Sequence, residues 1–161
     1  MKILVAVDES ENSERTIRYV GSLLRGISEI TLTLFHVLKP MPRKLLEHGG
    51  SENPAVEGRL STQLREEQEE WSRNEQVVEC SILTKARQTL EKTGFPTDRV
   101  ALRFGHEDDI ARNILEEARE GGYDTIAVGR HGVSKAKRMF GGGTTQQLLR
   151  DASGVTLWVI P

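Results

Sequence analysis

The chain has 161 residues, of which 37% are apolar and 29% are charged, a composition typical of one soluble globular domain. Its 22 basic and 24 acidic residues give a formal net charge of −2, which excludes a global basic field for nucleic acid. The mean hydropathy is −0.44 and no apolar run approaches the ~20 residues of a membrane span, so no membrane interaction is expected.

The first part of the chain predicts a strand, a helix and a second strand. Residues 3–7 (ILVAV) form a short apolar run typical of a strand buried on both faces. Asp8 or Ser10 is expected as the N-cap of the helix, and the spacing of Asp8 and Glu11 also fits a capping box. Residues 30–37 (ITLTLFHV) predict the second strand. The helix between the strands is indicated by apolar residues at helical spacing: Ile17, Val20, Leu23 and Leu24.

The middle of the chain changes character. Proline and glycine interrupt every regular pattern and predict an irregular loop at about 38–59. Residues 65–75 (REEQEEWSRNE) are expected to form a solvated helix face, the alternative being an acidic surface that binds a partner. Gly94 and Pro96 end the helix. This long helix is predicted because one face collects apolar residues spaced by four or seven: Leu60, Leu64, Trp71, Val78, Ile82 and Ala86.

The rest of the chain returns to strict alternation. Residues 99–104 (RVALRF), 123–128 (YDTIAV) and 155–160 (VTLWVI) predict three more strands. A fourth helix is expected around Gln146–Asp151, before the last of these strands. The third helix is marked by four residues: Ile110, Ile114, Leu115 and Ala118. Strands that alternate with helices predict an α/β fold in which helices cover both faces of a parallel sheet.

Cys80 is the only cysteine, so an internal disulfide cannot form. Because it lies beside Val78 and Ile82 in a helical pattern, we expect a buried structural thiol. The N-terminal segment MKILVAVDES lacks the apolar region and cleavage site of a secretory signal. A reducing, cytoplasmic setting is therefore the simplest interpretation.

Two loops carry candidate binding residues, because ligands of open parallel sheets bind beyond the carboxyl ends of the strands. After the first strand, the carboxylate of Asp8 could accept hydrogen bonds from a ribose or a base, or simply cap a helix. After the fourth strand, residues 129–143 are rich in glycine and lead into a helix N-terminus, which favours an anion. Four cations add a local positive field there: Arg130, Lys135, Lys137 and Arg138. The alternative is a flexible connector with solubilising charges.

Thr144 also has two interpretations. With Gln147 it fits a capping box in which Thr144 is the N-cap, and its hydroxyl could instead contact a phosphate. The four histidines show no metal-ligand spacing, so no metal site is expected.

Three segments of the chain resemble the universal stress protein family: ILVAVDESENSERTIRYV near the N-terminus, FHV at 35–37 and GYDTIAVGRHG at 122–132. The resemblance runs over residues 2–160 and is weakest at 38–75. It implies one domain over residues 1–161, an open five-stranded parallel sheet of order 3-2-1-4-5 with helices on both faces, the adenine nucleotide alpha hydrolase-like fold.

The most specific element of the resemblance is a nucleotide pattern: Gly, two residues, Gly, nine residues, Gly, then Ser or Thr. Gly129, Gly132 and Gly142 occupy the glycine positions, whereas Gly143 stands where the family has Ser or Thr. Thr144 restores a hydroxyl one residue later. The resemblance implies that ATP or a related adenine nucleotide, with or without Mg²⁺, binds at these residues: Ala6, Val7, Asp8, Val37, Gly129, Arg130, His131, Gly132, Gly142, Gly143 and Thr144.

The resemblance also implies a homodimer through the strand at 155–160, where Trp158 belongs either to the core or to the interface. The prediction is a cytoplasmic stress-response protein that acts as a nucleotide-dependent sensor or signalling module. No residue stands out as a general base for the γ-phosphate, so slow ATP hydrolysis at most is expected. The alternative is a nucleotide-free dimeric adaptor whose 38–75 segment recognises a protein partner. Replacing Gly132 and Gly142 with valine should abolish ATP binding in the first case and leave function unchanged in the second.

Overall fold

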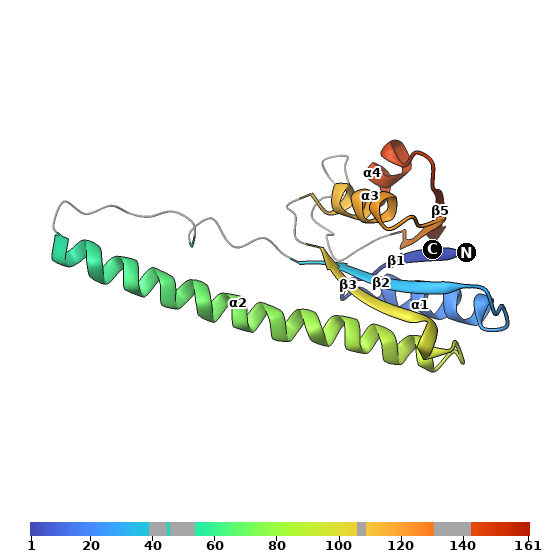
Figure 1. The fold of residues 1–161 in the computed structure, drawn as a ribbon, viewed down its shortest axis with the longest axis horizontal. Coiled ribbons are helices and arrows are strands. Elements are labelled where there is room, and N and C mark those ends of the chain that lie inside the picture. The colour runs from blue at the N-terminus through green and yellow to red at the C-terminus, as the bar shows by residue number, and fades with distance from the viewer. Residues whose placement is uncertain (39–44, 46–53, 106–108, 131–142) are drawn as a thin grey trace.

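A computed structural model describes residues 1–38, 45, 54–105, 109–130 and 143–161 (Figure 1). The elements in chain order are β1 (Lys2–Ala6), α1 (Glu11–Leu24), β2 (Thr31–Val37), α2 (Pro54–Glu91), the short 3₁₀ helix η2 (Thr97–Arg99), β3 (Val100–Gly105), α3 (Ile110–Glu120), β4 (Thr125–Gly129), α4 (Thr144–Asp151) and β5 (Thr156–Ile160). The described part of the chain contains no helix with enough consecutive apolar residues to cross a bilayer.

The five strands form one parallel sheet of order β3-β2-β1-β4-β5, which confirms the predicted fold class. β1 lies at the centre and pairs with β2 on one side and with β4 on the other. The chain therefore builds outward from β1 in one direction, and then returns to add β4 and β5 on the opposite side. The carboxyl ends of β1 and β4 flank the point where the strand order reverses, which is where ligands bind in such sheets.

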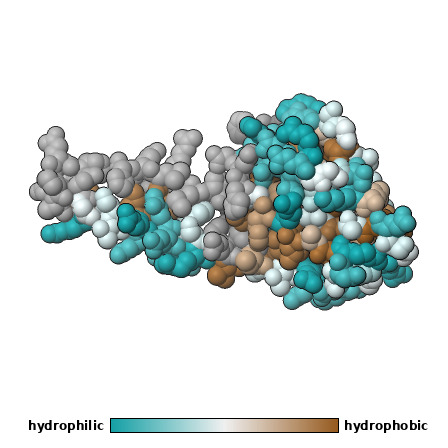
Figure 2. All heavy atoms as spheres, viewed as in Figure 1, coloured by the Kyte–Doolittle hydropathy of each residue, from teal (hydrophilic) through white to brown (hydrophobic). Residues whose placement is uncertain are grey.

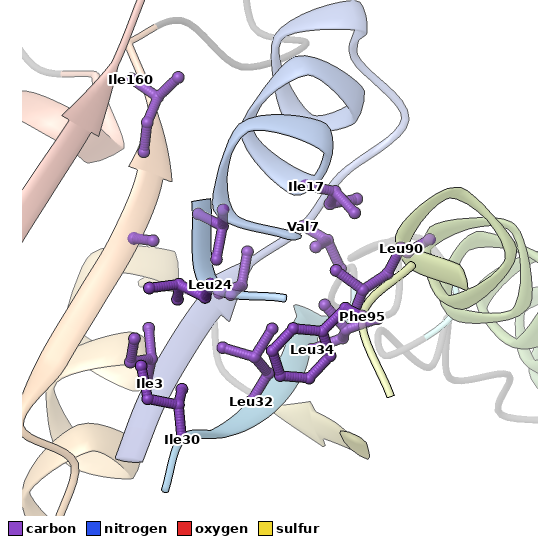
Figure 3. Packing of buried hydrophobic residues seen from close by; sticks show 14 of the residues in the cluster. Ile3, Val7, Ile17, Leu24, Ile30, Leu32, Leu34, Leu90, Phe95 and Ile160 are labelled. Atoms are coloured by element: carbon purple, nitrogen blue, oxygen red, sulfur yellow. The ribbon is translucent and has the colours of Figure 1, made fainter. Parts of the chain in front are cut away.

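The core has two layers because successive strand residues point to opposite faces of the sheet. Ile3 and Val5 pack with α1 and α2 on one face, where Figure 3 shows side chains from the helices and the strands converging. Leu4 packs with α3 and α4 on the other face, around Phe35 and Ile126. Both faces of the sheet are covered at β1, β2 and β4, as the apolar strand sequences predicted, whereas most residues of the edge strand β3 are exposed.

Two residues of the stripes predicted for α1 and α3 lie outside the core. Leu23 and Ile110 are both about half exposed, although each was assigned to a buried stripe. Each residue of a helix is rotated by about 100° from the next, and both side chains lie at the margin of their stripe. The neighbouring residues Leu24 and Ala111 are the ones that are buried.

Helix α2 differs most from its prediction. It begins at Pro54, so the predicted irregular loop does not extend to residue 59. Proline at the first position of a helix is favoured because its missing N–H would have no partner there. At 38 residues the helix is about 57 Å long, and in Figure 1 its N-terminal part extends well beyond the sheet.

The predicted apolar stripe of α2 is therefore only partly a core stripe. Ile82 and Ala86 are buried against the sheet, whereas Leu60 and Val78 are exposed. Cys80 is exposed as well, so the prediction of a buried thiol was wrong. Ile82 is the first residue of α2 that is buried among those described, and Cys80 lies about 200° around the helix from it.

The charged residues between positions 65 and 73 are exposed, as predicted for a solvated helix face. Figure 2 shows mostly hydrophilic residues along the projecting part of α2. One contact reaches this part from elsewhere in the chain: the Gln68 side-chain amide donates to the carbonyl oxygen of the buried Leu45 at 2.5 Å.

Candidate functional site

The carboxyl end of β1 holds Asp8 in a tight turn. One carboxylate oxygen of Asp8 accepts hydrogen bonds from the backbone N–H of Ser10 at 2.9 Å and from the Ser10 hydroxyl. The backbone N–H of Asp8 donates to the hydroxyl of Ser13 at 3.0 Å. Ser10 is the N-cap of α1, because its hydroxyl accepts from the N–H of Ser13 at 3.1 Å. Asp8 therefore does not cap the helix, and the predicted Asp8–Glu11 capping box is replaced by the Asp8–Ser10 turn.

The neighbouring strand ends at the same edge of the sheet. The N–H of Val7 donates to the carbonyl of Phe35 at 2.9 Å, and the buried imidazole of His36 lies 2.7 Å from the carbonyl oxygen of Val7 through its Nδ1 atom. Val37, which closes β2, is buried in the core cluster on the α3 side of the sheet. These backbone contacts keep the ends of β1 and β2 together and place Asp8 at the edge of the sheet.

Gly129 closes β4 on the other side of β1. A Cβ atom at this position would lie 3.2 Å from both the carbonyl oxygen of Asn12 and the hydroxyl of Thr16 on α1, tighter than nearly all real Cβ contacts. The glycine therefore lets α1 approach the end of β4 closely. Arg130 follows, with an exposed side chain and a backbone N–H that donates to the carbonyl of Ile160 at 2.7 Å.

Helix α4 begins at the same edge, but not at the predicted residue. Gly143 is the N-cap and Thr144 is the first helical residue, so the prediction of Thr144 as a cap was wrong. The Gly143 carbonyl accepts from the N–H groups of Gln146 and Gln147, at 2.9 and 3.1 Å. Within the described residues, the N–H groups of Thr144 and Thr145 have no acceptor. Such free N–H groups and the helix dipole attract an anion.

Two side-chain contacts hold α4 in this position. The hydroxyl of Thr145 donates to the carbonyl of Gly129 at 2.9 Å, which places the start of the helix beside the end of β4. The Gln147 amide, predicted to fold back on its own helix, donates instead to the carboxylate of Asp109 at 2.8 and 3.1 Å. Asp109 is the N-cap of α3 and accepts from the N–H of Arg112 at 3.1 Å. The Gln147 hydrogen bond, followed by that of Arg112, holds the pKa of Asp109 below its usual value.

The structure brings together most of the predicted site residues that it describes. Pairing of β1 with β2 and β4 places Ala6, Val7, Asp8, Val37 and Gly129 at the carboxyl ends of three adjacent strands. The Thr145 contact brings the start of α4, with Gly143 and Thr144, to the same edge. The predicted residues His131, Gly132 and Gly142 lie outside the described residues, as do the cations of that loop after Arg130.

Sequence reasoning missed Thr145 and Asp109, and it assigned Gln147 to the wrong partner. The Asp109–Gln147 contact spans 38 residues and depends on how two helices meet, which no local spacing reveals. Among the described residues, no group of three histidine, cysteine, aspartate or glutamate side chains could hold a metal ion.

An all-parallel open sheet, with an acidic turn and a helix N-terminus beside the point where the strand order reverses, defines an open α/β protein, a class whose ligands bind at that point. The model of one such family, described as the universal stress protein family, matches residues 1–161. The chain belongs to the universal stress protein family.

Solved structures of this family share the fold. The universal stress protein UspA from Lactobacillus plantarum matches with a TM-score of 0.67 at 19% identity, over 100% of this chain and 97% of its own. A universal stress protein from Archaeoglobus fulgidus in complex with dAMP matches with a TM-score of 0.60 at 17% identity, over 100% and 98%. A universal stress protein in complex with cAMP matches with a TM-score of 0.64 at 16% identity, over 100% and 96%. No curated protein sequence matches closely enough to count as a relative.

Proposed function

We propose that this chain binds ATP or a related adenine nucleotide in the crevice between Asp8 and the start of α4. The observation that carries the proposal is the start of α4, where the N–H groups of Thr144 and Thr145 have no acceptor among the described residues and lie beside the end of β4 through the Thr145–Gly129 hydrogen bond. These groups and the dipole of α4 would receive the phosphates. Two universal stress proteins of similar fold are complexes with dAMP and cAMP, which supports an adenine nucleotide as the ligand.

The other half of the crevice would hold the nucleoside. We assign the Asp8 carboxylate, one oxygen of which accepts from Ser10, to a ribose hydroxyl or the adenine amino group. Ala6, Val7 and Val37, which lie at the adjoining strand ends, would line the nucleoside side of the crevice. Gly129, Arg130 and the loop residues His131, Gly132 and Gly142 would complete the phosphate side, with Mg²⁺ as a counterion where the nucleotide carries it.

Gly143 in place of the family's Ser or Thr costs the site one hydroxyl. A single neutral hydrogen bond contributes only about 1 kcal/mol, so backbone donors suffice for binding. Thr144, the first residue of α4, offers a hydroxyl one position later. In this role the protein is a cytoplasmic nucleotide-dependent sensor or signalling module in a stress response, with slow hydrolysis at most.

Thermal unfolding tests the proposal directly. ATP with Mg²⁺ at 100 times its dissociation constant should stabilise the chain by about 2.7 kcal/mol, because the ligand binds only the folded state. For a chain of this size the melting temperature should rise by roughly 5–10 °C. Inorganic triphosphate without a nucleoside is the control and should give a smaller rise. No rise with millimolar ATP would contradict the proposal.

A homodimer through residues 155–160 is the second part of the proposal. The N–H of Thr156 and the carbonyl of Ile160 make hydrogen bonds of 3.0 and 2.7 Å with residues that flank β4. Both groups therefore lie on the side of β5 that faces β4. Since backbone groups alternate sides along a strand, Leu157 and Val159 present theirs to the open edge of the sheet. Trp158, which packs against the core cluster under α1, stabilises the strand on the inner side. A second copy would pair with the open edge.

Val159→Pro should convert the dimer to a monomer in light scattering coupled to size exclusion. Proline removes the outward N–H at an edge position where the strand tolerates it. Val159→Thr keeps that N–H and nearly the same shape, so it should remain a dimer. A wild-type mass of one chain, 18.0 kDa, would refute the interface.

The projecting part of α2 supports a second candidate, the nucleotide-free adaptor. This part of the helix leaves the sheet and exposes Val56, Leu60 and Val77, which a protein partner could cover (Figure 1). A dimer that shows no thermal response to ATP would favour this candidate over the nucleotide sensor.

A further inference from the structure

Helices α3 and α4 begin close together, and one pair of side chains joins their first turns. The Gln147 amide nitrogen lies 2.8 and 3.1 Å from the two carboxylate oxygens of Asp109. Asp109 is at the same time the N-cap of α3, through the N–H of Arg112. A neutral amide thus holds an anion that already has a function in its own helix.

The Gln147–Asp109 hydrogen bond matters for the position of α4 because this helix is short. Its eight residues are too few for a stable helix in water, so its direction depends on what it contacts. Leu148 is fully buried among the residues of the α3 side of the core and anchors one face of the helix. The Thr145 hydroxyl joins the first turn of α4 to β4, and Gln147 joins the same turn to α3.

The Gln147–Asp109 hydrogen bond also fixes the position of the Asp109 carboxylate. Gln147 follows Thr144 by about one helical turn, so the Asp109 carboxylate lies near the end of α4 that carries the free N–H groups. A carboxylate released from Gln147 could reach toward those N–H groups or repel a phosphate bound there. While Gln147 engages both oxygens, the anion stays with α3.

We infer that Gln147 and Asp109 are positioning residues for the bound nucleotide: their hydrogen bond aims the Thr144 and Thr145 amides into the crevice and keeps a competing carboxylate away from them. The inference rests on the proposed nucleotide site. It assigns a role in affinity to two residues that lie outside the family's glycine pattern and touch no part of the nucleotide themselves.

The test measures ATP affinity by calorimetry in variants that break the Gln147–Asp109 hydrogen bond or reverse its donor and acceptor. Gln147→Glu places two carboxylates together and should weaken ATP affinity about tenfold, which is the loss expected for a broken charge-assisted hydrogen bond. Adding Asp109→Asn to that variant restores a donor and an acceptor with reversed polarity, and asparagine still caps α3. The double variant should recover affinity to within about threefold of the wild type.

Leu149→Glu is the matched control, because this side chain is 61% exposed on α4 and the change adds the same charge to the same helix, beyond its first turn. It should change the affinity by less than about twofold. Gln147→Ala breaks the Gln147–Asp109 hydrogen bond without adding charge. It takes the place of Gln147→Glu in the test if circular dichroism shows that the Gln147→Glu variant is unfolded.

Each outcome decides the matter. Equal affinities for Gln147→Glu and Leu149→Glu, or a double variant that stays as weak as Gln147→Glu, would overturn the positioning role while the nucleotide site stands. A wild-type chain that fails to bind ATP would overturn the site and the inference together.

Discussion

Asp8→Asn is expected to weaken ATP binding roughly 10- to 100-fold while leaving the fold intact. The Asp8–Ser10 turn fixes one oxygen of the side chain as an acceptor, and an asparagine carbonyl can take that place. The side chain then has no charge and one acceptor oxygen fewer, which weakens the acceptor that we assign to the nucleotide. A hydrogen bond to a charged group is worth about 1.5–3 kcal/mol, which sets the size of the loss.

Asp98→Asn is the control for this variant. Asp98 is an exposed acidic residue of η2, before β3, so the substitution removes the same charge far from the crevice. It should leave ATP affinity unchanged, and both variants should melt close to the wild-type temperature. If Asp8→Asn bound ATP as tightly as Asp98→Asn does, Asp8 would have only its structural role in the turn.

The largest expected effect on stability is that of Phe35→Ala, about 3–5 kcal/mol of unfolding free energy. Phe35 lies in β2 between Ala6 of β1 and Arg103 of β3 and is 1% exposed. Its ring lies against Gly105, where an added Cβ atom would be only 2.7 Å from the ring carbon Cζ. The vacated space is bounded by sheet backbone, which cannot collapse to fill it.

Urea denaturation followed by circular dichroism measures this loss. Leu149→Ala removes a comparable apolar side chain that is 61% exposed on α4, and it should change stability by no more than about 0.5 kcal/mol. Phe35→Leu should fall between the two and remains measurable if the alanine variant does not fold. A loss below about 1 kcal/mol for Phe35→Ala would show that the cluster on this face repacks around the gap.

The strands were predictable because they follow from short-range rules. Apolar runs such as ILVAV at 3–7 predict strands buried on both faces. The alternation of these strands with helices is compatible with only a few sheet topologies. The order itself came with the family resemblance. Ser10 as a cap was also foreseeable, since a cap is satisfied by N–H groups two or three residues away.

The details of the site were less predictable. Thr144 and Gln147 match a capping box by spacing, yet Gly143 is the cap and Gln147 turns to Asp109. A side chain that can hydrogen-bond within its own helix or to a neighbouring helix takes the partner that helix packing brings close. The spacing of residues along one helix does not reveal that partner. The burial of Cys80 was predicted wrongly for a related reason. Periodicity identifies the apolar face of a helix but not the part of the protein that this face contacts.

By itself, the sequence determined the alternation of strands and helices, the two-sided burial of the central strands and an acidic residue at the tip of the first strand. These properties arise from hydrogen bonds and hydrophobic patterns between near neighbours in the chain. Only the tertiary structure decided how far α2 runs past the sheet, which amides of α4 stay free, and that Gln147 meets Asp109. Those outcomes depend on contacts between residues tens of positions apart, whose distances are set when the helices dock on the completed sheet.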